Sequence, residues 1–169
     1  MSFVTAGETR IPKTHLTQRT EDNFEVLNSQ KMFETGKNVF FTLPGAFTPT
    51  CSTRQLPRYE ELFEEFQAKG VDNIYCFSVN DGFVMNAWAN DLNITKVKMV
   101  ADGNGAFANK LGILVDKTNL GFGKRAWRCA AVVEDGLITQ WYEEPGICQD
   151  AGDDPYKVTN PENILSNLE

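Results

Sequence analysis

Short apolar runs alternate with amphipathic stretches along the middle of this sequence, and this alternation constrains the fold more than any other feature. Residues 38–43, rich in β-branched and aromatic side chains and closed by Pro44-Gly45, predict a buried strand followed by a loop. Residues 73–79 and 97–100 predict two more strands, and helical periodicity follows each of the three. This order implies a central sheet with parallel strands and helices on its faces.

The pattern changes in the last third of the chain. Residues 126–133 and 137–142 flank a Glu-Asp-Gly turn and predict an antiparallel hairpin, and Asn160-Pro161 predicts the start of a final helix. The whole order predicts an α/β protein of thioredoxin-like fold, with a central mixed sheet flanked by helices and one insertion. No repeat or long linker divides the sequence, so we expect a single domain spanning residues 1–169.

The charge and cysteine content exclude several classes of protein. Sixteen basic and 23 acidic residues give a net charge of −7, and the basic residues are scattered, which argues against a nucleic-acid or membrane partner. Residues 1–13 hold no signal-peptide core, and no run approaches the roughly 18 apolar residues of a membrane span. The four cysteines lack zinc-site and Cys-x-x-Cys spacing. We therefore expect a metal-free protein of the reducing cytoplasm.

One cysteine stands where the first predicted strand and its loop give way to a helix. After Cys51, apolar side chains recur at helical spacing in Leu56, Tyr59, Phe63 and Phe66. Cys51 should therefore lie in the first turn of this helix, where free backbone N–H groups and the positive end of the helix dipole favour a thiolate over a thiol. The sequence thus predicts a nucleophilic cysteine.

The base that such a cysteine often needs is missing nearby. Proteases and acyl-transfer enzymes pair the nucleophile with a histidine, but the only histidine, His15, lies far upstream in a polar segment where we expect a solvated loop. A thiolate formed by electrostatics alone suits an electrophile with a good leaving group, such as a peroxide oxygen. The product would be a cysteine sulfenic acid.

The loop before the cysteine carries a specific motif. Pro44, Thr48 and Cys51 match the Pro-x-x-x-Thr-x-x-Cys pattern of peroxiredoxins, and the fuller stretch Pro-Gly-Ala-Phe-Thr-Pro-Thr-Cys-Ser resembles the peroxiredoxin-5 type within the AhpC/TSA and redoxin superfamily. The similarity covers about residues 39–144. It implies that Cys51 is the peroxidatic cysteine, that the Thr48 hydroxyl meets the peroxide, and that Pro44 shields the pocket from water.

The same resemblance implies an arginine beside the thiolate, and Arg128 stands at the matching position on a late strand. A guanidinium is always charged, so it holds the sulfur ionised, and its planar fork can orient a peroxide oxygen. The backbone N–H groups of Gly45 and Cys51 should complete a cradle of donors. The predicted substrate-binding residues are therefore Gly45, Thr48, Cys51 and Arg128.

The other cysteines bear on how an oxidised Cys51 is reduced. Cys76, in an apolar strand, and Cys129, expected on the strand face opposite the arginine, are interpreted as packing residues. Cys148 lies in a predicted exposed loop and stays open as a resolving cysteine that would form a disulfide with Cys51. We favour a one-cysteine cycle with an external thiol reductant. The resemblance points to glutathione with glutaredoxin, and thioredoxin is the other candidate.

The sequence therefore predicts an antioxidant thiol peroxidase that reduces hydrogen peroxide and small organic hydroperoxides without metal or flavin. The resemblance implies a homodimer, in which some of Phe83, Trp88, Phe122 and Trp127 contact the second copy, although core packing is the simpler expectation for each. Two other functions stay open. One is a redox sensor or relay whose Cys51 oxidation controls a partner, and the other is a thioredoxin-fold chaperone.

Overall fold

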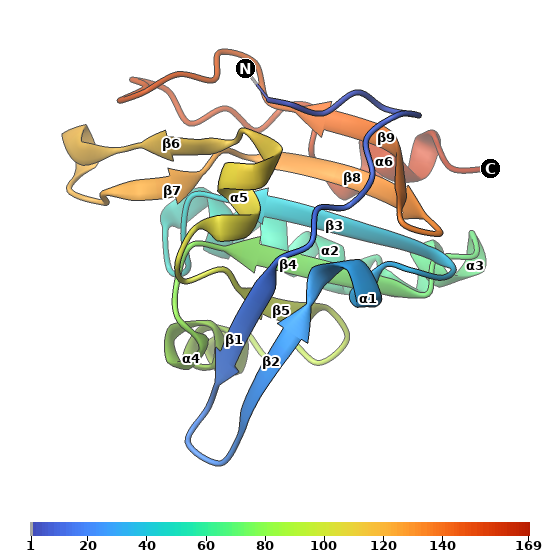
Figure 1. The fold of residues 1–169 in the computed structure, drawn as a ribbon, viewed down its shortest axis with the longest axis horizontal. Helices are drawn as coiled ribbons and strands as arrows, with labels where there is room; N and C mark the ends of the chain where they lie inside the picture. Colours follow the sequence, from blue (N-terminus) through green and yellow to red (C-terminus); the bar gives the residue numbers. More distant parts are fainter. Residues whose placement is uncertain (1) are drawn as a thin grey trace.

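A five-stranded mixed sheet lies at the centre of the computed structural model, which describes residues 2–169 (Figure 1). Strands β3 and β4 pair in parallel, as do β4 and β5, whereas β3–β8 and β8–β9 are antiparallel. The strand order is β5-β4-β3-β8-β9, which confirms the predicted mixed sheet. The strands are β3 (Lys37–Leu43), β4 (Asn73–Ser78), β5 (Lys98–Ala101), β8 (Cys129–Glu134) and β9 (Leu137–Glu143).

Helices cover both faces of this sheet, as predicted. One face packs against α2 (Leu56–Glu61), α3 (Phe63–Ala68), α4 (Gly82–Asp91) and α6 (Pro161–Ser166), and the other against α1 (Ser29–Met32) and α5 (Ala106–Leu111). Figure 1 shows α5 and the N-terminal segment on one side of the sheet. None of the helices within residues 2–169 has the length and apolarity to cross a membrane.

The alternation of side chains along β3 explains why both faces are covered. Val39, Phe41 and Leu43 point into the cluster beneath α2 and α4, while Phe40 joins the opposite cluster with the rings of Phe33 and other aromatic residues. Successive strand side chains point to opposite faces, so a strand that is apolar throughout must be buried on both. All four of these β3 side chains are fully buried.

Two hairpins were missed by the sequence reading. The first joins β1 (His15–Arg19) to β2 (Phe24–Asn28) and projects away from the sheet beside α4, and the second joins β6 (Leu114–Asp116) to β7 (Lys124–Ala126) (Figure 1). The prediction that His15 lies in a loop is therefore wrong. It is exposed, as expected, but it begins β1.

The strand predicted over residues 126–133 is interrupted. It is divided into β7 and β8, and Trp127 and Arg128 lie between them rather than on a continuous strand. The backbone N–H of Trp127 donates to the carbonyl of Ile113 (2.8 Å), and its own carbonyl accepts from the Thr42 hydroxyl (2.7 Å). The chain therefore passes at Trp127 and Arg128 from the two-stranded β6–β7 sheet to the central sheet, which it joins at Cys129.

Candidate active site

The motif loop follows directly from the carboxyl end of β3 and is fixed at three successive residues. The carbonyl of Pro44 accepts from Nη1 of Arg125 (3.1 Å), and the carbonyl of Gly45 accepts from the Thr48 hydroxyl (2.7 Å). The N–H of Ala46 donates to Oδ1 of Asn80 in the loop after β4 (3.0 Å). The loop is therefore pre-organised rather than left to solvent.

Cys51 is the first residue of a helical turn, as predicted, but the turn is π-helical rather than α-helical. This segment, η1 (Cys51–Gln55), is closed by the Leu56 N–H on the carbonyl of Cys51 and leads into α2. Single π turns inside helices are frequent at functional sites. Its second residue, Ser52, accepts a hydrogen bond from the indole N–H of the buried Trp88 (2.8 Å), which ties the turn to α4.

Two backbone N–H groups of the motif segment make no hydrogen bond among the described residues. Within residues 2–169, no hydrogen bond uses the N–H groups of Gly45 or Cys51, whereas the next N–H, that of Ser52, donates to the Thr48 carbonyl (3.0 Å). The Cys51 side chain is 0 % exposed. A buried sulfur beside two unused donors is an arrangement that favours a bound anion or polar oxygen.

The residue that contacts the sulfur is Arg128. Its Nη2 donates to Sγ of Cys51 (3.3 Å), and the arginine is only 1 % exposed. Nε donates to Oε1 of Gln55 (2.8 Å), Nη1 donates to the Pro155 carbonyl (2.8 Å), and both terminal nitrogens bond the Asp154 carboxylate. All three guanidinium nitrogens are therefore held, which fixes the direction of the bond to sulfur.

The electrostatics of the site involve two arginines. Burial lowers the pKa of Arg128, but the charge on Cys51 and the contacts with Asp154 raise it, and the net pKa is raised. Burial lowers the pKa of Arg125, and the charge on Cys51 opposes this shift. Arg128 donates a charge-assisted hydrogen bond to the sulfur, which favours a thiolate, whereas Arg125 makes no hydrogen bond to the sulfur within residues 2–169 and acts on it through its charge.

A buried carboxylate holds the segment that supports Arg128. Glu144 is 0 % exposed and accepts from the backbone N–H groups of Lys157 (2.7 Å), Val158 (2.9 Å) and Thr159 (2.8 Å), and from the Thr159 hydroxyl (2.7 Å). Four donors satisfy the buried charge, as burial of a carboxylate requires. Glu144 therefore fixes the chain immediately after Asp154 and Pro155.

The structure brings together the five predicted site residues, which come from two segments of the chain: Pro44, Gly45, Thr48 and Cys51 from the first, and Arg128 from the second. Arg128 follows Cys51 by 77 positions in the sequence, and the two side chains are hydrogen-bonded. The sequence reading missed Arg125, Gln55 and Asp154. Gln55 lies one helical turn after Cys51, and this spacing was the one available signal for it. Its Nε2 is buried without a partner among the described residues.

The remaining cysteines lie in different surroundings. Cys76 shares the core cluster of Cys51, and burial, together with the charge on Cys51, raises its pKa well above the ordinary value. Cys129 lies in the cluster on the opposite face of the sheet, where burial likewise raises its pKa. Cys148 is exposed and lines a separate hollow with Trp127 and Pro145.

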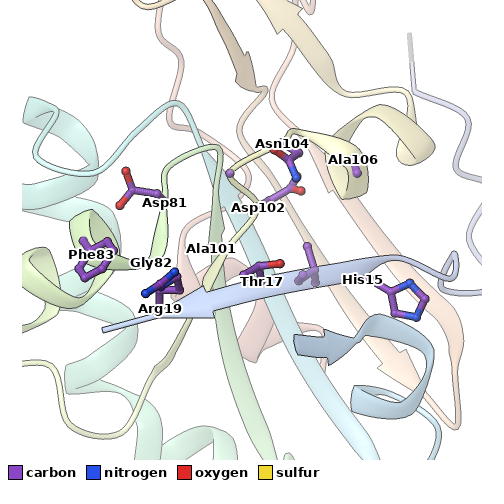
Figure 2. A pocket seen from close by; sticks show the side chains of 12 residues that line it. His15, Thr17, Arg19, Asp81, Gly82, Phe83, Ala101, Asp102, Asn104 and Ala106 are labelled. Atoms are coloured by element: carbon purple, nitrogen blue, oxygen red, sulfur yellow. The ribbon is translucent and has the colours of Figure 1, made fainter. Parts of the chain in front are cut away.

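A second hollow of about 180 Å³ lies at the carboxyl ends of β4 and β5 (Figure 2). His15 lies at one end of it, Asp81 and Phe83 at the other, and Asp102 in its wall. Within residues 2–169 no hydrogen bond joins His15 to Cys51 or Arg128. The only histidine of the chain therefore takes no part in the arrangement around the sulfur.

The fold and the site together define a thiol-dependent oxidoreductase on a thioredoxin-like scaffold. Residues 5–154 match the family described as Redoxin. A peroxiredoxin of Sinorhizobium fredii is 51% identical over 145 residues, which cover 86% of this chain and 77% of the relative, and one of Rhizobium etli is 46% identical over 95% of this chain and 89% of the relative. The chain belongs to the peroxiredoxin family, and it is a thiol-dependent peroxidase.

Solved structures agree with this assignment. Reduced Prx3 of Vibrio vulnificus, solved in complex with H2O2, superposes with a TM-score of 0.89 at 36% identity, covering 99% of this chain and 100% of that one. The antioxidant protein of Plasmodium falciparum, a 1-Cys peroxiredoxin, gives a TM-score of 0.89 at 33% identity, covering 92% of this chain and 94% of that one. These similarities confirm the predicted thioredoxin-like fold.

Proposed function

We propose that Cys51 is the peroxidatic cysteine and that it reduces hydrogen peroxide and small organic hydroperoxides. The observation that carries this proposal is the hydrogen bond from Arg128 Nη2 to the buried Cys51 sulfur (3.3 Å). The thiolate attacks one peroxide oxygen, so an S–O bond forms and the O–O bond breaks. The second oxygen leaves as hydroxide or alkoxide and takes up a proton, while the sulfur is oxidised by two electrons to the sulfenic acid.

The other motif residues hold the peroxide in this proposal. The free N–H groups of Gly45 and Cys51 donate to it, the Thr48 hydroxyl exchanges its bond to the Gly45 carbonyl for one to the peroxide, and the buried Pro44 keeps water away. Fixed donors aimed at developing negative charge lower the barrier because they need no reorganisation. The Vibrio vulnificus relative crystallised with H2O2 supports a peroxide-binding role for the site.

For the reductive half of the cycle we propose one reactive cysteine and an external thiol, glutathione with glutaredoxin. The first thiol attacks the sulfenic sulfur, which gives a mixed disulfide and water, and a second thiol then releases Cys51 as thiolate. The exposed Cys148 lines a hollow of its own, and a similar chain is a 1-Cys peroxiredoxin. Because the Cys51 sulfur is 0 % exposed, the η1 turn has to open before a thiol as large as glutathione reaches it.

Mass spectrometry after one equivalent of peroxide tests this cycle. We expect a Cys51 sulfenic acid that glutathione converts to a mixed disulfide, and sustained turnover with glutathione and glutaredoxin in the C148S and C76S variants. A Cys51–Cys148 or Cys51–Cys76 disulfide, with turnover lost in the matching serine variant, would show internal resolution. Rapid oxidation of Cys51 without turnover on any thiol would instead favour the redox sensor.

We also propose that the chain forms a homodimer through the face that carries the motif loop and the first turn of α4. Phe47 of the motif loop and Phe83 of α4 are 51 % and 48 % exposed, and Phe47 lies beside the buried Trp88 of α4 (ring centroids 6.4 Å apart). Exposed apolar patches of this kind mark contact sites. Analytical ultracentrifugation of F83E and of the unmodified protein, each measured alone, tests this proposal. We expect a lower molecular mass in solution for the variant, and equal masses would contradict the proposal.

A further inference from the structure

Arg125 makes close contacts with the active-site loop. It belongs to β7 and is half-buried, its Nη1 donates to the Pro44 carbonyl (3.1 Å), and its Nε donates to the carbonyl of Phe122 (3.1 Å). The guanidinium also lies over the Phe122 ring, 5.2 Å from its centroid. Two fixed hydrogen bonds and a ring contact hold this side chain in one orientation.

The same guanidinium occupies the space beside Gly45. A Cβ atom built on Gly45 would overlap Nη1 of Arg125, although the backbone of Gly45 is not in the left-handed region and would itself accept a side chain. Glycine is therefore required here by the close approach of Arg125 and not by the backbone conformation. The absence of a side chain at Gly45 therefore leaves the space that the Arg125 guanidinium occupies.

We propose that Arg125 is a positioning residue that orients the Gly45 N–H toward the peroxide. The C=O of Pro44 and the N–H of Gly45 belong to one planar trans peptide, so they point in opposite directions. By holding the carbonyl, Arg125 turns the N–H away from itself, and that N–H has no partner among residues 2–169. This inference rests on the proposed function, in which the Gly45 N–H is a peroxide donor.

Arg125 also interacts with the thiolate, so its charge and its hydrogen bond have to be separated by experiment. Alkylation of Cys51 by iodoacetamide needs the thiolate but not the Gly45 donor, whereas the reaction with peroxide needs both. In R125M we expect the rate constant with hydrogen peroxide to fall about tenfold, the effect of one charge-assisted hydrogen bond, while the alkylation rate changes less than about threefold. R125K, which keeps a cation and a donor, should recover part of the peroxide rate.

The neighbouring exposed cation provides a matched control. K124M removes one charge from the same strand without touching the loop, and it should leave both rates unchanged. Equal falls of the two rates in R125M would show that Arg125 acts by charge alone and would overturn the proposal, as would an unchanged peroxide rate. If Cys51 of the unmodified protein does not react with hydrogen peroxide, the proposed function itself is refuted.

A double-mutant cycle tests the same contact from the side of the glycine. In G45A the new methyl group displaces the Arg125 guanidinium, so we expect the peroxide rate to fall about tenfold. In R125A the overlap with the guanidinium is gone and the added methyl group meets Thr48 Cγ2 at 3.3 Å, so adding G45A should cost less than about twofold further. Additive effects of the two substitutions would contradict the proposal, because residues that act through one contact show strong coupling.

Discussion

Replacing Arg128 with methionine removes the only side-chain hydrogen bond to the Cys51 sulfur among residues 2–169 and leaves the side-chain volume nearly unchanged. At the observed 3.3 Å, two unit charges attract by about 5 kcal/mol for an effective dielectric constant of about 20. Part of this energy is recovered by other donors and by water, so we expect the activation barrier for oxidation by peroxide to rise by about 2–4 kcal/mol. That corresponds to a fall of about 30- to 1,000-fold in the rate of oxidation by peroxide.

The assay is single-turnover oxidation of Cys51 by hydrogen peroxide, followed by quenching and mass analysis. R128K should retain an intermediate rate, because an ammonium group keeps the charge but has three N–H donors for the five hydrogen bonds that the Arg128 guanidinium makes. D154N removes the outer carboxylate and leaves the contact with sulfur, so its rate should fall less than about fivefold. If R128M, folded by circular dichroism, reacts within threefold of the unmodified protein, the assigned role of Arg128 is wrong.

Three further substitutions test separate parts of the structure. T48V should lower the peroxide rate about 10- to 100-fold with alkylation of Cys51 little changed, because it removes the hydroxyl but keeps the shape; equal loss of both rates would contradict this. E144Q should lower the free energy of unfolding in urea by about 2–4 kcal/mol, because the amide nitrogen has to face a backbone donor; an unchanged midpoint would refute it. Burial raises the pKa of Asp102 from 3.8 to about 6, so the folded state binds the proton more tightly and stability falls as the pH rises from about 4 to 6. The stability of the unmodified protein minus that of D102N should therefore fall by up to about 3 kcal/mol between pH 4 and pH 7, and a flat or rising difference would show that the carboxyl is not perturbed.

The sequence predicted the elements whose residues are apolar throughout or regularly spaced. The runs that form β3 and β4, predicted over residues 38–43 and 73–79, were placed nearly residue for residue, because burial on both sheet faces leaves a direct pattern. The β1–β2 hairpin was missed because its strands are short and mostly exposed, so burial leaves no apolar run in the sequence to mark them.

The residues of the candidate site likewise fall into those that a local sequence pattern predicts and those that it does not. Pro44, Thr48 and Cys51 form a local motif, and the structure places them together as the motif suggests. Arg125 and Asp154 were missed because their relation to the sulfur depends on where distant segments meet. Asp154 reaches Arg128 from 26 positions away and Arg125 reaches Pro44 from 81, and no spacing rule connects such positions.

The most direct test of the central claim is the identity of the sulfur that peroxide oxidises first. A sulfenic-acid probe such as dimedone, added with one equivalent of hydrogen peroxide and followed by peptide mapping, reads all four cysteines at once. We expect the label on Cys51, and none on any cysteine in C51S. Labelling of Cys76, Cys129 or Cys148 ahead of Cys51, or peroxide consumption by C51S at the unmodified rate, would contradict the proposed mechanism.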